Sequence, residues 1–113
     1  MEGLVRGDIV VIPFPFSDLS ATKRRPALVL AILGKEDVLL CQITSRNRLD
    51  STAIELRVQD FSSGGLSVSS FVRCGKLFAA STRIIEKRVG VLHPAALAAI
   101  AERNANIILG SPE

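Results

Sequence analysis

The side chains that could do chemistry in this chain are mostly cationic. Lysine and arginine together number 14, and five of them fall in two polar segments, residues 23–25 and residues 46–48. Arginine suits a phosphate site because its planar guanidinium donates two parallel hydrogen bonds to phosphate oxygens. The alternative for any such residue is a solvated basic rim. We favour that alternative for three cations: Arg57, Lys87 and Arg88.

The other groups used in catalysis are sparse. The one histidine, His93, precedes Pro94 and is expected at the start of a helix. Cys41 and Cys74 lie in apolar surroundings without CxxC spacing, which favours two buried thiols over a disulfide or a metal site. The acidic residues are scattered, and no glycine-rich phosphate loop is present. The sequence therefore predicts neither a metal nor a cofactor.

Length and composition predict one domain over residues 1–113 with an aliphatic core. Hydrophobic residues make up 48% of the chain, but aromatic residues only 4%, with no Trp or Tyr. The net charge is +3 and the pI about 9.3, a mild preference for a polyanionic partner. No apolar run approaches the ~20 residues of a membrane span, and the N-terminus lacks the pattern of a secretory signal. We therefore expect a cytoplasmic protein.

Short strands followed by one helix must position the cations. The pattern predicts strands over residues 8–12, 27–33, 38–44, 52–58 and 69–80. Prolines 13 and 15 are expected to end the first strand, Pro26 to open the second, and residues 62–65 to form a turn. Apolar residues then recur at helical spacing from Pro94, and Gly110 is a stop signal. This order predicts a mainly β fold, a small barrel or strongly coiled sheet, with a C-terminal α-helix.

Several of these segments together resemble the PemK/MazF family of toxins. A Gly7-Asp8 dipeptide leads the first strand, and an Arg25-Pro26 dipeptide leads the aliphatic run 27–30. The third strand closes on a hydroxyl residue, and two later blocks resemble the family's last strand and its turn into the terminal helix. These segments are residues 42–45, 72–77 and 84–92. Each segment is short, but their order and spacing hold from about residue 6 to residue 110.

The resemblance implies a fold, an activity and partners. The family fold is a β-barrel related to SH3 barrels with helices packed around it, and the working unit is a homodimer. The implied activity is sequence-specific cleavage of single-stranded RNA by a type II toxin, neutralised by a cognate antitoxin. The ribose 2′-hydroxyl attacks the adjacent phosphate and leaves a 2′,3′-cyclic phosphate and a 5′-hydroxyl, with no metal or cofactor.

The resemblance also assigns roles to residues. Arg25 matches the catalytic arginine, which stabilises charge on the phosphate. Thr44 matches the catalytic hydroxyl residue at the strand end, with Ser45 as the alternative if the register slips by one; Thr44 is otherwise an ordinary strand residue. Many members carry a Gly-Ser-Glu motif in the first loop, and this chain has none there. The residues expected to bind RNA are Ser20, Lys23, Arg24, Ser45, Arg46, Arg73 and Lys76.

Two other functions fit the same scaffold. Related toxins of this fold inhibit DNA gyrase, and such a toxin would use the exposed face of the terminal helix and would not need Arg25 or Thr44. A noncatalytic SH3-like module that binds nucleic acid or peptide would need an aromatic-lined groove. The chain has no Trp or Tyr to build that groove, so the ribonuclease is the hypothesis we place first.

Overall fold

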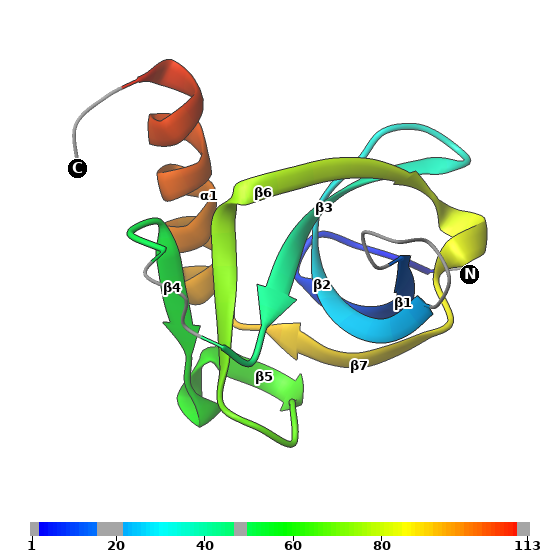
Figure 1. Cartoon of the computed structure of the whole chain (residues 1–113), viewed down its shortest axis with the longest axis horizontal. Helices are drawn as coiled ribbons and strands as arrows, with labels where there is room; N and C mark the ends of the chain where they lie inside the picture. The colour runs from blue at the N-terminus through cyan, green and yellow to red at the C-terminus, as the bar shows by residue number, and fades with distance from the viewer. Residues whose placement is uncertain (1–2, 16–21, 47–49, 111–113) are drawn as a thin grey trace.

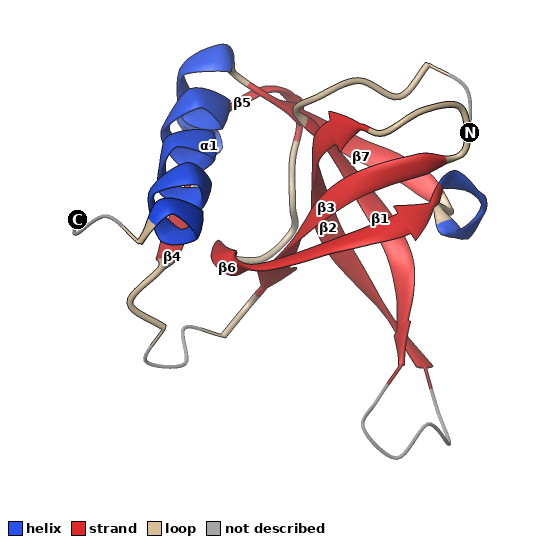
Figure 2. Cartoon of the chain, turned by 90° about the horizontal axis from the view of Figure 1, so that it is seen from above, coloured by secondary structure: helices blue, strands red, loops and turns tan. Residues whose placement is uncertain are grey.

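The computed structural model describes residues 3–15, 22–46 and 50–110. Seven antiparallel strands form one sheet in the order β4-β6-β3-β2-β1-β7-β5, and the sheet curls around itself with helix α1 beside it (Figures 1 and 2). The strands are β1 (Asp8–Pro15), β2 (Thr22–Ile32), β3 (Asp37–Thr44), β4 (Ala53–Leu56), β5 (Phe61–Gly64), β6 (Ser70–Ser81) and β7 (Lys87–Leu92). The helix α1 spans Pro94–Leu109, and two short 3-10 helices are η1 (Val58–Asp60) and η2 (Thr82–Ile84). The prediction of a mainly β fold with a C-terminal helix is confirmed.

Burial on both faces explains the continuous apolar runs in the first three strands. Alternate residues of a strand point to opposite faces of the sheet. One face of β1–β3 contributes Ile9, Leu28 and Ile43 to a cluster that also contains Leu97 of α1. The other face contributes a second cluster, which includes Val10, Val29 and Leu40. The fully buried residues of both clusters are aliphatic apart from the two cysteines, as the composition predicts.

The first strand continues through its prolines, so the prediction that Pro13–Pro15 ends it is wrong. Pro13 pairs with Arg24 in the β1–β2 ladder, and Pro15 with Thr22. The carbonyl of Val11 accepts the amide of Glu86 (2.9 Å), so the polar groups of Val11 point toward β7. Pro13 and Pro15 follow at two-residue spacing and turn the same way, beyond the last β1–β7 pair. Their missing N–H groups therefore cost no hydrogen bond in the described sheet.

The second strand starts at Thr22, not after Pro26. Lys23, Arg24 and Arg25 pair with Phe14, Pro13 and Ile12 across the β1–β2 ladder. The prediction that Pro26 opens the second strand is therefore wrong, and residues 23–25 lie within β2. Because a strand fixes the direction of each side chain, the cationic segment has defined faces.

The β6 strand is continuous through Gly75 and changes partners along its length. Its first residues pair with β4 and with the end of β3, and its later residues pair with the start of β3. The predicted turn over residues 62–65 is wrong in part, because Phe61–Gly64 forms β5 and pairs with β7. The predicted strand over 52–58 shortens to Ala53–Leu56, and η1 follows it.

The terminal helix begins and ends where the sequence predicts. His93 is its N-cap residue, although its side chain makes no capping hydrogen bond, and Pro94 occupies the first turn. Gly110 adopts the left-handed conformation (φ 73°), and its amide donates to the carbonyls of Asn106 and Ile107. Among the described residues no helix is long and apolar enough to cross a membrane.

Candidate functional site

The β2–β3 ladder brings Arg25 toward Thr44. Ala27 pairs with Gln42 and Leu28 with Cys41, and Arg25 and Thr44 each lie two residues beyond the Ala27–Gln42 pair, on β2 and β3 respectively. Because side chains alternate between the two faces of a strand, Arg25 lies on the same face of β2 as Ala27, and Thr44 on the same face of β3 as Gln42. Both residues are half-buried. Two residues 19 positions apart in the sequence thus occupy one end of the same strand pair.

Thr44 is the last residue of β3, and its hydroxyl is held in a turn. Thr44 Oγ1 accepts the backbone amide of Arg46 at 3.2 Å, which turns the chain away from the strand. Among the described residues the Thr44 hydroxyl donates no hydrogen bond, so its proton can be donated to a ligand. Ser45 and Arg46 follow immediately and are exposed.

Two adjoining hollows lie beside the cationic end of β2. The first has a volume of about 240 Å³ and is lined on one side by Lys23, Arg24, Arg25 and Ser45. The second has a volume of about 370 Å³ and shares Arg24, Arg25, Pro26, Leu66 and Ser67 with the first. Lys87, which the sequence placed on a solvated rim, lines the second hollow. We call the two hollows together the cationic groove.

The cations of this groove are little neutralised. Arg24 pairs with Glu86 (Nε–Oε1 2.5 Å), but 71% of the Arg24 side chain is exposed. Lys23 is exposed, and the Arg25 side chain makes no hydrogen bond or ion pair with any residue in the described part of the chain. The groove therefore keeps a positive potential and suits an anion.

Arg73 lies elsewhere and is engaged in an ion pair. Its Nε is 2.9 Å from Asp50 Oδ2, and both side chains are largely buried. Asp50 also accepts hydrogen bonds from Thr52 N (2.9 Å) and Thr52 Oγ1 (2.6 Å). The hydrogen bond from Arg73, followed by those from Thr52, lowers the pKa of Asp50 to about 2. This network connects Asp50, in the segment between β3 and β4, to Arg73 of β6.

The remaining residues expected to bind RNA are dispersed. Arg46 is exposed just after β3, and Lys76 is exposed within β6, outside the lining of the cationic groove. Ser20 lies outside the described residues. The structure thus brings together Lys23, Arg24, Arg25 and Ser45, whereas Thr44, the residue before Ser45, lines neither hollow of the groove.

Sequence reasoning missed the opposite wall of the groove, which is the segment between β5 and β6. Leu66, Ser67 and Val68 line the groove from this segment. Gly64 holds the segment against β7: its φ is +64°, and a Cβ there would lie 2.2 Å from the carbonyl oxygen of Val89. The available signal was the Gly64-Gly65 pair followed by several serines.

The thiols are buried, as the sequence predicts. Cys41 and Cys74 are both fully buried, and neither forms a disulfide. Cys41 Sγ donates to the Arg73 carbonyl (3.0 Å), and burial raises the pKa of the Cys41 thiol to about 12. Cys41 is therefore protonated at neutral pH and is no nucleophile. Within the described part of the chain, no three His, Cys, Asp or Glu side chains gather as metal ligands would.

Solved structures share this fold. A mycobacterial endoribonuclease in complex with its cognate antitoxin superposes with a TM-score of 0.72 at 16% identity, covering 98% of this chain and 99% of that one. MazF in the MazE–MazF complex (Form III) of Deinococcus radiodurans gives 0.71 at 21% identity, over 96% and 98%. The Mycobacterium tuberculosis toxin MazF-mt6 gives 0.65 at 19% identity, over 92% and 99%. No curated protein sequence gives a significant match.

The amino-acid sequence itself carries the family assignment. A family described as the PemK-like, MazF-like toxin of type II toxin–antitoxin systems matches residues 5–108. The match spans β1 through nearly all of α1 and includes both Arg25 and Thr44. The chain belongs to the PemK-like, MazF-like toxins of type II toxin–antitoxin systems.

Proposed function

We propose that this protein is an endoribonuclease that cleaves single-stranded RNA in the cationic groove without a metal or cofactor. The observation that carries the proposal is the position of Arg25 and Thr44, each of which lies two residues beyond the Ala27–Gln42 pair of the β2–β3 ladder. The structural relatives described as endoribonucleases support it. So does the groove itself, where Lys23, Arg24 and Lys87 surround Arg25.

The reaction is a transfer of the phosphate within the RNA. The ribose 2′-oxygen bonds to phosphorus as its proton leaves, and the bond from phosphorus to the 5′-oxygen breaks as that oxygen gains a proton. The products are a 2′,3′-cyclic phosphate and a 5′-hydroxyl. Negative charge grows on the phosphate oxygens in the transition state. The Arg25 guanidinium, unpaired among the described residues, stabilises that charge.

Other residues bind and orient the RNA. The Thr44 hydroxyl donates a hydrogen bond to the phosphate or the 2′-oxygen, because its oxygen already accepts the amide of Arg46. Lys23 and Arg24 bind flanking phosphates as exposed point charges. Arg73 and Lys76 lie outside the groove, so they contact only RNA that extends beyond it.

We also propose the partners and location of the family for this chain. Relatives have been solved in complex with a cognate antitoxin and with MazE. A cognate antitoxin would neutralise this toxin by binding it directly. A cytoplasmic homodimer is the proposed working unit, and light scattering at tens of micromolar tests it.

Two variants of Thr44 test the proposal in cells and in vitro. Thr44→Ala removes the hydroxyl and should weaken both growth inhibition and RNA cleavage, by about 10-fold or more. Thr44→Ser keeps the hydroxyl and should retain most of both. Intact RNA together with gyrase inhibition in the wild type would instead support the gyrase-inhibiting alternative.

A further inference from the structure

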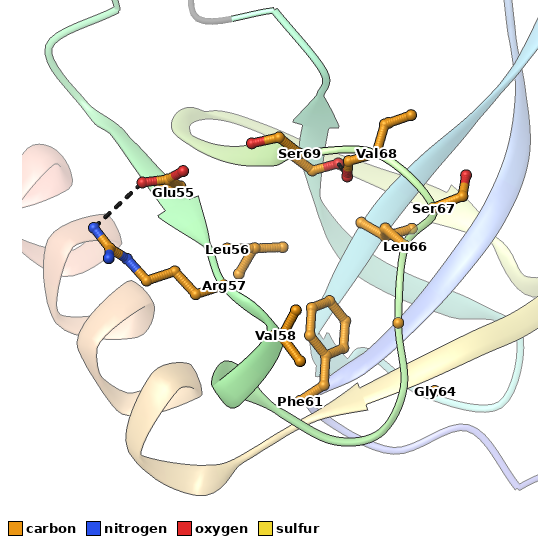
Figure 3. A pocket seen from close by; sticks show the side chains of 12 residues that line it. Glu55, Leu56, Arg57, Val58, Phe61, Gly64, Leu66, Ser67, Val68 and Ser69 are labelled. Atoms are coloured by element: carbon orange, nitrogen blue, oxygen red, sulfur yellow. Dashed lines mark hydrogen bonds and ion pairs between the residues drawn. The ribbon is translucent and has the colours of Figure 1, made fainter.

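A larger pocket adjoins the cationic groove. Its volume is about 480 Å³, and it shares Leu66, Ser67, Val68 and Ser70 with the first hollow of the groove. Its other wall comes from β4, η1 and β5 (Figure 3). The segment between β5 and β6 is therefore a common wall between a cation-lined hollow and this second pocket.

The inner surface of the pocket is apolar. Leu56 is buried, and Phe61 and Leu66 are half-buried. Figure 3 shows the Phe61 ring rising between Val58 and the segment that carries Leu66. Val58 is an apolar residue at the rim and is 90% exposed.

Both walls are held in place by backbone hydrogen bonds. The Arg57 amide donates to Asp60 Oδ2 (2.7 Å), and the His93 amide donates to the Asp60 carbonyl (2.8 Å). On the opposite wall the Gly65 amide donates to the Val89 carbonyl (3.1 Å). The pocket is therefore formed before any ligand binds, which reduces the ordering cost of binding.

The charges indicate what kind of group the pocket takes. Its lining carries one cation, Arg57, and one carboxylate, Glu55, which pair at 3.3 Å, so the pocket has no excess positive charge for a phosphate, unlike the groove. The hydroxyls of Ser67 and Ser69 make no hydrogen bond with the described residues and remain free for a polar edge. A flat, neutral group with an aromatic face and a hydrogen-bonding edge fits these features. In single-stranded RNA that group is the nucleobase.

We propose that this pocket is a nucleobase subsite, in which a base next to the phosphate held in the cationic groove stacks on Phe61. The inference rests on the proposed function and adds the part of the site that reads the RNA. The common wall at Leu66 and Ser67 places a phosphate-binding surface and a base-binding surface side by side, as in one nucleotide. Ser67 and Ser69 then contact the edge of that base.

The test scans an RNA oligonucleotide that the wild type cleaves, made uncleavable by a 2′-deoxy substitution at the scissile nucleotide. An abasic residue is placed at each position in turn, and fluorescence anisotropy gives the Kd for wild type and Phe61→Leu. In the wild type, one position near the scissile phosphate should lose about 10- to 100-fold in affinity. In Phe61→Leu the same abasic substitution should cost little more, because the stacking is already lost. The control variant Phe78→Leu removes a half-buried ring from the other core cluster and should behave as wild type.

A second variant guards against misfolding of Phe61→Leu. Val58→Asp adds a negative charge at a fully solvated rim position and should weaken RNA binding, whereas Ile108→Asp, on the exposed end of α1, should not. Equal losses from every abasic position in wild type and Phe61→Leu would overturn the inference while leaving the ribonuclease intact. So would normal RNA binding by Val58→Asp, which would leave the pocket to a protein partner. A wild type that cleaves no RNA would overturn the proposed function itself, before any variant is compared.

Discussion

The arginines on β6 and β7 differ from those on β2 in the carboxylates that face them. Arg88 Nε lies 3.0 Å from Asp8 Oδ2, and the Asp8 side chain is only 1% exposed. Arg73 is paired in a similar way with Asp50. On β2, Arg24 has only an exposed partner, and Arg25 has none among the described residues. An arginine that neutralises a buried carboxylate stabilises the fold, whereas an arginine at the groove is available to bind a ligand.

The energetic consequence differs as well. Removing one partner of a buried pair leaves an uncompensated charge and costs several kcal/mol, whereas an exposed pair contributes about 0–1 kcal/mol. Asp8 also accepts the amide of Val5 (2.9 Å), and Arg88 Nη2 donates to the Gly3 carbonyl (2.7 Å). The Asp8–Arg88 pair thus holds the segment before β1 against β7.

The largest expected effect is on catalysis, at Arg25. Arg25→Ala should lower the rate of RNA cleavage by about 10²–10³, because it removes the group that stabilises charge growing in the transition state. Its circular dichroism spectrum should match the wild type. A variant that cleaves RNA at the wild-type rate would show that the groove only attracts RNA.

The next effect is on stability, at Asp8. Asp8→Ala should lower the free energy of unfolding by about 3 kcal/mol, since it leaves Arg88 and the Val5 amide without their partner. Urea unfolding followed by circular dichroism measures it. The matched control is Glu86→Ala, which breaks the exposed pair with Arg24 and should cost less than about 1 kcal/mol. Equal losses in the two variants would remove the distinction between the two sets of arginines.

A smaller effect is the acid dependence of stability from Asp50. The folded pKa of Asp50, about 2, lies below its ordinary value of 3.8, so the stabilisation is present above pH 4 and is lost as the pH falls toward 2. We expect about 1–2 kcal/mol from this group. Unfolding free energies from pH 5 to pH 2 should fall less steeply for Asp50→Asn than for the wild type. Parallel curves would show that Asp50 is not held ionised by Arg73.

The smallest effect is at Arg24. Arg24→Ala should weaken RNA binding a few-fold and lower the slope of log Kd against log salt by about 1, as the loss of one phosphate contact does. The cleavage rate at saturating RNA should stay near the wild-type value. If Arg24→Ala lowered that rate as much as Arg25→Ala does, the assignment of the catalytic role to Arg25 alone would be wrong.

The comparison also shows what the sequence could predict. Local patterns placed β3 and α1 closely, because hydrophobic periodicity, Pro94 and Gly110 act over a few residues. The extent of β1 and β2 was predicted poorly, because the tolerance of Pro13 and Pro15 depends on which strand edge faces them. That edge is set by strand order, which single-residue propensities do not report.

The candidate site divides in the same way. Arg25 and Thr44 were found from the family resemblance, and their positions two residues beyond the Ala27–Gln42 pair follow only from the register of β2 and β3. Nothing near Arg73 in the sequence predicted its pairing with Asp50, because the two residues meet only after β6 folds against the end of β3. The wall at residues 66–68 was missed because apolar and serine residues carry no chemical signature until a cavity forms beside them.

The most direct test of the central claim is to identify the ends of RNA cleaved in the presence of EDTA. The proposed reaction at Arg25 and Thr44 predicts undiminished cleavage with EDTA, products ending in a 2′,3′-cyclic phosphate and a 5′-hydroxyl, and no cleavage when the scissile nucleotide is 2′-deoxy. Products with a 5′-phosphate, cleavage of the 2′-deoxy substrate, or activity lost to EDTA and restored by Mg²⁺ would contradict it.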